Sequence, residues 1–124
     1  MSVSWRATSL YALVPALLLA LGCGGAGSAL DTKDVAGGQK LFLQTCATCH
    51  GPDGKGLPRL GRNLHGNEFV GSRTDDDLVE FLKVGRPASD PLNDGGTDMP
   101  PRGGNPTLED DDLLLIVSYL RSFQ

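Results

Sequence analysis

Cys46, Cys49 and His50 form a Cys-x-x-Cys-His motif, which places two thiols and one imidazole within five residues. Side chains of these types at this spacing bind metals, exchange disulfides or attach to a cofactor. A zinc site needs two further ligands, and His65 is the only other His or Cys nearby. A thioredoxin-type pair belongs to a βαβ context, which this sequence does not show. Covalent attachment of a cofactor is therefore the favoured interpretation.

The same spacing is the attachment signature of c-type haem. Two cysteines three residues apart at a helix end face the same way, so they reach the two vinyl groups of one porphyrin. His50 then falls under the ring and ligates the iron. Thioether bonds keep the haem on a protein too small to enclose it otherwise. We expect Cys46 and Cys49 to hold one covalent haem c, with His50 as an axial ligand of the iron.

A second axial ligand must come from the opposite face of the haem. The chain has two methionines, Met1 and Met99, and only Met99 lies beyond the N-terminal segment, 49 residues after His50. It stands in a stretch rich in Gly and Pro and not on an apolar helix face, which argues against a role as core filler. A thioether ligand raises the reduction potential. Met99 is the predicted second ligand, and His65 is the competitor.

Three helices are predicted to position these groups, over residues 32–45, 75–84 and 108–122. The first contains Gly37 and Gly38, which are costly in a helix interior and therefore indicate close packing against another element. Residues 51–106, between the motif and the last helix, are rich in Gly and Pro, with 11 Gly and 7 Pro in 56 positions that include the second helix. Most of them are expected to be loop.

Capping residues predict the ends of the second and third helices. Thr74 caps the second, with Asp77 three residues later, and Gly85 ends it. Thr107 caps the third, with Asp110 three residues later. The third helix has one apolar face, formed by Leu113, Ile116, Val117 and Leu120.

Composition limits the classes of protein that this chain can be. A chain of 124 residues with 6% aromatic residues has a thin core and needs a staple such as a disulfide, a metal or a cofactor. The net charge of −4 argues against nucleic-acid binding, whose footprint is a basic patch. No alternating strand pattern occurs. We predict an all-α fold of three to four helices and long loops wrapped around one covalently bound haem.

From about Val35 to its end, the chain resembles class I cytochrome c, the small single-haem electron carriers. Gly51 follows the attachment motif, as often in that family. Gly38 and Phe42 lie eight and four residues before Cys46, at positions where the family's first helix crosses its last. The resemblance implies the class I cytochrome c fold and one haem c. The last helix adds a segment similar to the family's apolar-x-x-Tyr ending: Ile116, Val117, Ser118, Tyr119 and Leu120.

The segment 63–66 also resembles the family's sequence after the haem-binding helix. In the family, the backbone carbonyl just before this segment accepts the proton of the ligand imidazole. Arg62 stands here where the family usually has Pro, and Pro58 is a rival. The resemblance implies a carbonyl bond that fixes the tautomer of His50, from either residue.

Charged residues gather in two acidic runs, 75–77 with Glu80 and 109–112. Carboxylates there complement helix dipoles and caps, and a role in docking a partner is the alternative. Four arginines stand in loops that are expected to wrap the haem, and one or two of them are candidates to bind a propionate. They are Arg59, Arg62, Arg86 and Arg102.

Residues 1–22 are predicted to be a signal peptide. Arg6 is the only charge before Asp31, and the apolar run over 10–21 is too short to span a bilayer comfortably. Gly22-Cys23 directly after this run resembles a bacterial lipoprotein signal, in which Cys23 becomes the lipidated first residue. Cleavage near residues 26–29 and an uncleaved anchor are the alternatives. All three export the chain.

The predicted organisation is a signal peptide, a flexible tether over 23–31 and a cytochrome c domain over 32–124. We expect a one-electron carrier, not an enzyme, on the periplasmic side of a bacterial membrane, with a lipid anchor. The resemblance implies a quinol–cytochrome c reductase as donor and a terminal oxidase or another reductase as acceptor. The alternatives are a fixed haem c subunit of a larger respiratory oxidoreductase complex, and an enzyme or gas sensor with an open iron site.

Overall fold

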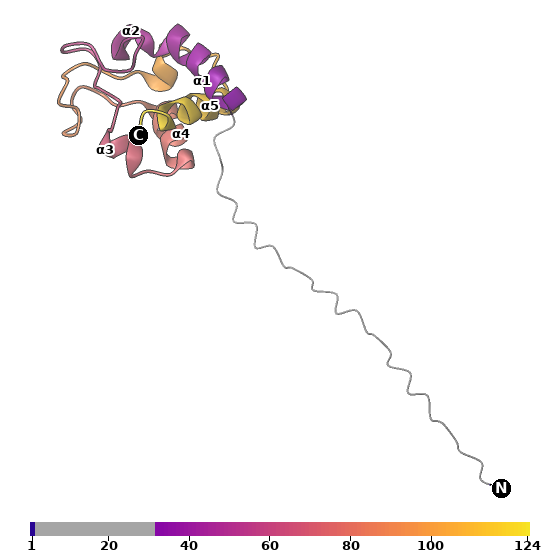
Figure 1. Cartoon of the computed structure of the whole chain (residues 1–124). Helices are drawn as coiled ribbons and strands as arrows, with labels where there is room; N and C mark the ends of the chain where they lie inside the picture. Colours follow the sequence, from indigo (N-terminus) through magenta and orange to yellow (C-terminus); the bar gives the residue numbers. More distant parts are fainter. Residues whose placement is uncertain (2–31) are drawn as a thin grey trace.

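A computed structural model describes Met1 and residues 32–124. The described residues form helices joined by long loops, without a named strand (Figure 1). The predicted all-α fold is confirmed. In chain order the elements are α1 (Thr32–Thr45), α2 (Ala47–His50), α3 (Glu68–Gly71), α4 (Asp75–Val84), the 3₁₀ helix η1 (Pro101–Gly104) and α5 (Asp110–Arg121).

The first and last helices, α1 and α5, pack across one another (Figure 1). Gly38 makes this possible, because a Cβ atom there would collide with the backbone carbonyl of Leu115 in α5. One turn later, the buried ring of Phe42 meets Tyr119 edge to face, with ring centroids 5.3 Å apart. The close packing predicted for the glycine pair therefore occurs at Gly38.

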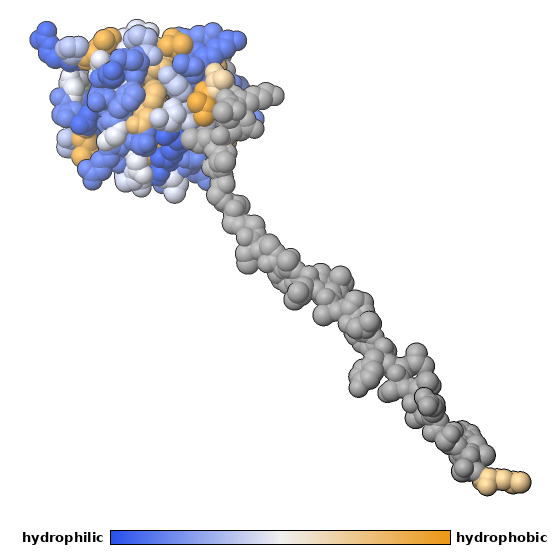
Figure 2. Space-filling model, viewed as in Figure 1, coloured by the Kyte–Doolittle hydropathy of each residue, from blue (hydrophilic) through white to orange (hydrophobic). Residues whose placement is uncertain are grey.

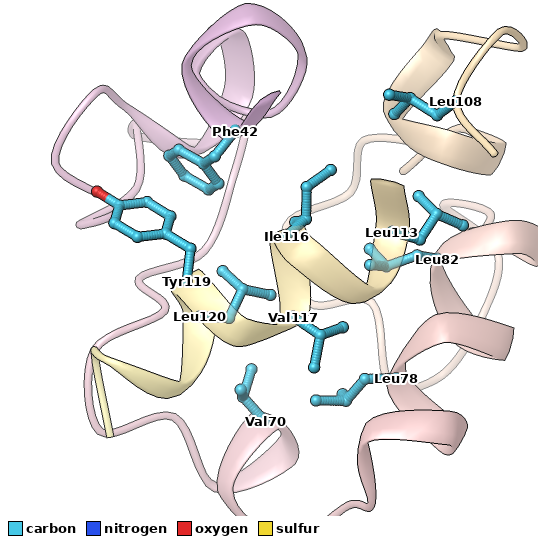
Figure 3. Close-up of a cluster of buried hydrophobic side chains, with 10 residues drawn as sticks. All are labelled: Phe42, Val70, Leu78, Leu82, Leu108, Leu113, Ile116, Val117, Tyr119 and Leu120. Carbon is cyan, nitrogen blue, oxygen red and sulfur yellow. The ribbon is translucent and has the colours of Figure 1, made fainter. Parts of the chain in front are cut away.

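The buried core lies between α1, α4 and α5 (Figure 3). The apolar face of α5 supplies half of it, as the sequence predicted, and α4 supplies Leu78 and Leu82. Fully burying such side chains contributes about 1.5–3 kcal/mol each. The ten core residues are Phe42, Val70, Leu78, Leu82, Leu108, Leu113, Ile116, Val117, Tyr119 and Leu120.

Helix α4 begins and ends where its caps predict. The Thr74 hydroxyl accepts from the backbone N–H of Asp77 at 3.2 Å, and the Asp77 carboxylate accepts from the N–H of Thr74 at 3.3 Å. These bonds to Thr74 lower the pKa of Asp77. Gly85 follows the helix with φ 72°, a conformation that favours glycine.

Helix α5 begins two residues later than predicted, and its cap is a different residue. Glu109 and Asp112 form the capping box, in place of Thr107 and Asp110. The reason is local, since both the N–H and the hydroxyl of Thr107 donate to the side chain of Asn105, at 3.1 and 2.7 Å. Thr107 is thus engaged in a turn before the helix.

Three short elements were not predicted: α2, α3 and η1. Each has four residues, which is too short to show a helical period in the sequence. Asn67 caps α3 by accepting from the N–H groups of Phe69 and Val70 at 3.1 and 3.4 Å. In η1, Arg102 and Gly103 both have positive φ, 53° and 64°. This element therefore turns sharply soon after Met99.

The face shown in Figure 2 is mostly hydrophilic, with apolar residues scattered over it. Of the described residues, no helix is long and apolar enough to cross a bilayer. The predicted signal peptide, the lipidation site Cys23 and the tether over 23–31 lie outside the residues that the structure describes.

Candidate functional site

Cys46, Cys49, His50 and Met99 lie on the wall of one cavity of about 380 Å³. This volume falls in the range of sites for small molecules and cofactors. The rest of the wall is largely apolar, because core residues of α4 and α5 face the cavity. Side chains 49 or more residues apart in the sequence are thus brought to one concave site. The apolar wall includes Phe42, Val70, Leu78, Leu82, Leu108, Leu113, Ile116 and Leu120.

The two cysteines stand on one helical turn that follows α1. The N–H of Cys46 donates to the carbonyl of Phe42 at 2.8 Å, and the N–H of Cys49 donates to the carbonyl of Cys46 at 3.1 Å. Both thiols are free. Burial, with a smaller contribution from Cys49, raises the pKa of Cys46 to about 11. A reactive thiol of the thioredoxin type has a lowered pKa, so the raised pKa of Cys46 argues against redox exchange.

His50 is fixed on its ring and on its backbone. Its Nδ1 lies 2.9 Å from the carbonyl oxygen of Arg62, so Nδ1–H donates and Nε2 is left available for a metal. Of the two carbonyls proposed from the sequence, the structure therefore selects Arg62 and not Pro58. The carbonyl of His50 also accepts from the N–H of Gly56 at 2.8 Å. The first bond fixes the tautomer of the imidazole, and the second holds the backbone of His50.

Gly61 allows the loop that carries Arg62 to lie against the end of α2. A Cβ atom at Gly61 would collide with the backbone carbonyl of Cys49. Leu57 and Gly61 also form an isolated bridge, with the N–H of Leu57 donating to the carbonyl of Gly61 at 3.0 Å. This close approach could not be predicted from the sequence, because it joins residues of two different segments.

The backbone of Met99 is joined to the residues that follow α4. Its N–H and carbonyl both pair with the backbone of Arg86, each at 2.8 Å. Gly85 allows the backbone of Met99 to lie this close, since a Cβ at Gly85 would collide with the carbonyl oxygen of Met99. Gly85 also has a positive φ, which favours glycine. Met99 thus reaches the cavity on a segment tied to the end of α4.

His65, the competing ligand, does not lie on the cavity wall. Its Nε2 lies 2.7 Å from the carbonyl oxygen of Asp53, and its ring stacks on Phe123 with centroids 4.3 Å apart. These contacts hold the imidazole between a loop and the end of the chain, away from Met99.

All four predicted loop arginines border the cavity: Arg59, Arg62, Arg86 and Arg102. Three of them are engaged by carboxylates. Arg62 pairs with Asp94 at 3.0 Å, and Arg86 lies 3.7 Å from Asp90. Arg102 pairs with Asp110 at 3.0 Å.

Arg59 differs from the other three. Its side chain forms no ion pair with the described side chains of residues 34–124, while its backbone carbonyl accepts from the hydroxyl of Thr97 at 3.0 Å. Its backbone has φ 59°. Of the four arginines, Arg59 is therefore the best candidate to donate hydrogen bonds to a carboxylate of a bound cofactor, because its guanidinium has no carboxylate partner among the described side chains.

The site residues suit a covalent haem better than a bare metal. Across residues 32–124, no group of three or more His, Cys, Asp or Glu side chains is arranged to hold a metal ion. The wall instead offers two free thiols, one imidazole with a fixed tautomer, one thioether and an apolar surface. Together with the helical fold, these features define a c-type haem protein.

The chain belongs to the cytochrome c family, whose model matches residues 35–124. Membership implies one covalently bound haem c. It is 29% identical over 97 residues to the Cbb3-type cytochrome c oxidase subunit CcoP of Rhodobacter capsulatus, covering 77% of this chain and 31% of that protein. It is 33% identical over 75 residues to the Cbb3-type cytochrome c oxidase subunit FixP of Bradyrhizobium diazoefficiens, covering 57% and 26%.

The chain therefore spans less than a third of the length of these curated relatives. No solved structure matches it.

Proposed function

We propose that this protein transfers one electron at a time through a single haem c. Cys46 and Cys49 form the thioether bonds, and His50 and Met99 are the axial ligands. The observation that carries the proposal is the meeting of all four side chains on one apolar cavity wall, with Nδ1 of His50 bound to the carbonyl of Arg62.

The haem, when bound, supplies an iron that cycles between the ferric and ferrous states. The chain's contribution is to hold the ligands in place and to keep water away from the site. The bond from His50 to Arg62 and the two backbone bonds from Met99 to Arg86 are already present in the protein. Ligands held in this way change little in geometry between oxidation states, which favours fast transfer.

The first candidate role is a mobile carrier between membrane redox complexes. In this role a quinol–cytochrome c reductase donates the electron, and a terminal oxidase or another reductase accepts it. A fixed haem c subunit of a larger respiratory complex is the second candidate. The naming of both relatives as Cbb3-type cytochrome c oxidase subunits favours this second role.

Purification distinguishes the two roles. A fixed subunit stays with a membrane complex through detergent extraction and size-exclusion chromatography, and its haem is reduced at the same rate as the complex turns over. A carrier separates from the complex, and adding it back restores electron flow in proportion to its concentration. These experiments require only the native membranes and the isolated full chain.

The location of the protein is also part of the proposal. Residues 1–22 act as a lipoprotein signal, Cys23 carries the lipid and residues 23–31 tether the haem domain to the periplasmic face of the membrane. Eight residues after Cys23 span at most about 28 Å when extended, so the haem would stay near the membrane surface. Intact mass of the native protein tests this: diacylglycerol on Cys23 is expected, and a soluble product that begins near residues 26–29 contradicts it.

A ligand-binding assay tests the main proposal against an open iron site. The ferrous wild-type protein is expected to bind carbon monoxide slowly, because Met99 occupies the sixth position, whereas Met99→Ala binds it rapidly. An enzyme or gas sensor with an open site would bind carbon monoxide rapidly in both forms, and that result would overturn the assignment.

A further inference from the structure

Asp110, the first residue of α5, joins two segments on either side of Met99. One carboxylate oxygen, Oδ2, accepts from Nζ of Lys83 in α4 at 2.9 Å. The other, Oδ1, accepts from a guanidinium nitrogen of Arg102 at 3.0 Å. Lys83 lies two residues before Gly85, and Arg102 lies three residues after Met99. The carboxylate thus bridges the end of α4 and the turn that follows Met99.

Arg102 is held in a defined position by this contact. Its guanidinium donates both to Asp110 and to the carbonyl oxygen of Leu108, and its side chain is only 24% exposed. Its backbone has φ 53° within η1, and its side chain borders the cavity. Two hydrogen bonds from one planar group restrict its orientation more than a single bond does.

The other end of the Met99 segment is joined to α4 by backbone bonds. Arg86 and Met99 exchange two such bonds at 2.8 Å, directly after Gly85. Without Asp110, the segment would keep this attachment at one end, while the turn at Arg102 would lose its charged partner on α5. Local opening of the segment then requires fewer interactions to break.

We propose that Asp110 is a positioning residue that keeps Met99 on the haem iron. It touches neither Met99 nor the cofactor and acts through Arg102 and Lys83. This inference rests on the proposed function, in which Met99 is the axial ligand.

The neighbouring Asp111 provides a matched control. It lies in the same first turn of α5, is exposed, and takes part in none of the ion pairs among the described side chains, residues 34–124. Both carboxylates interact with the helix dipole in a similar way. A difference between Asp110→Asn and Asp111→Asn therefore reports the bridge to Lys83 and Arg102 and not the charge at the helix end.

The experiment compares full-length holoprotein in four forms: wild type, Asp110→Asn, Asp111→Asn and Met99→Ala. Two readouts follow the methionine ligand, the rate of carbon monoxide binding to the ferrous protein and the ferric absorption band of the methionine–iron bond. Asp110→Asn is expected to bind carbon monoxide about threefold faster than wild type, and to lose the band at a lower temperature. Far-UV circular dichroism, which follows the helices, is expected to melt at the same temperature in both asparagine variants.

Three further variants test the route through Arg102. Arg102→Lys keeps a positive charge but cannot span Leu108 and Asp110 with one planar group, so it is expected to behave like Asp110→Asn. Combining the two substitutions is expected to add little to either alone, because both remove the same bridge. Asp110→Glu, which keeps the carboxylate, is expected to recover part of the wild-type behaviour.

Equal carbon monoxide rates in Asp110→Asn and Asp111→Asn, while Met99→Ala opens the iron, would overturn the positioning role and leave the proposed function intact. If Met99→Ala itself leaves the rate unchanged, the assignment of the ligand is wrong and the inference is overturned with it.

Discussion

His50 and Met99 lie on the wall of the same cavity, but the segments that carry them are anchored by different interactions. Around His50, the contacts are neutral: a ring-to-carbonyl bond to Arg62, a backbone bond from Gly56, and the close approach of Gly61 to Cys49. The thioether bonds, once formed, add a covalent link directly beside it.

Around Met99, charged side chains supplement the backbone bonds. The carboxylates of Asp90 and Asp110 pair with Arg86 and Arg102, two cavity-lining arginines on either side of Met99 in the sequence. Charge pairs near the surface weaken as the salt concentration rises, and they are lost when a falling pH protonates the carboxylate. Neutral backbone bonds and covalent links do not depend on salt or pH in this way. We therefore expect the segment that carries Met99 to open before the segment that carries His50.

Replacing Met99 is expected to have the largest effect, because it removes the ligand of the methionine side altogether. Met99→Ala leaves the haem covalently attached, because Cys46 and Cys49 are unchanged. The reduction potential should fall by roughly 0.2 V, since axial ligands tune the potential over a wide range. Potentiometric titration measures the fall, and denaturing electrophoresis with haem staining checks attachment. A variant with the wild-type potential would show that another residue is the ligand.

Adding one methyl group at Gly85 is expected to have the next largest effect. Gly85→Ala places a Cβ against the carbonyl oxygen of Met99, at a backbone φ of 72° that disfavours alanine. A cost of about 1–3 kcal/mol in the free energy of unfolding follows from strained backbone of this kind. Gly66→Ala is a useful control, because Gly66 also has a positive φ, 56°, but has open space around it.

Both glycine variants should lose stability in a chemical denaturation experiment, but only Gly85→Ala should also accelerate carbon monoxide binding. Equal acceleration in both would mean that strain spreads through the loops and is not confined to the Met99 segment.

Acid is expected to release the methionine side first. Hydrogen bonds from Lys83 and then Arg102 lower the pKa of Asp110 below its usual range. The stabilisation is therefore fully present above the ordinary aspartate pKa of about 4 and is lost as the pH falls through the lowered value.

Absorption spectra recorded between neutral pH and pH 2 check this order. The methionine–iron band should disappear at a higher pH than the signal of the histidine-bound haem. Asp110→Asn should lose the band at a pH at least as high as wild type does, because it lacks the bridge at every pH. Simultaneous loss of both ligands would contradict the comparison.

The pair between Arg62 and Asp94 is expected to have the smallest effect. Its side chains are 52% and 66% exposed, and exposed pairs typically contribute about 0.2–1 kcal/mol, less at high salt. Asp94→Asn should therefore change the free energy of unfolding by about 0.5 kcal/mol or less. The imidazole bond should persist, because it uses the backbone carbonyl of Arg62 and not its side chain. A large loss of haem binding in this variant would show that the side chain supports His50.

Local signals in the sequence were sufficient for several parts of this protein. The cysteine motif predicted the haem and one ligand, because attachment depends on residues within a single turn. Thr74, Asp77 and Gly85 predicted the bounds of α4 correctly, since capping involves neighbours three residues apart. Gly37 and Gly38 predicted close packing, because glycines are costly inside a helix, and the structure shows it at Gly38.

Interactions between distant residues were decided by the tertiary structure alone. The choice of Arg62 over Pro58 depends on a loop that returns to His50 across 12 residues. From the sequence, Asp110 was predicted to belong to a helix cap with Thr107. In the folded chain it pairs with Arg102 and with Lys83, which is 27 residues away. Residue types and short spacings determine which groups are present, but only packing of separate segments determines which of them meet.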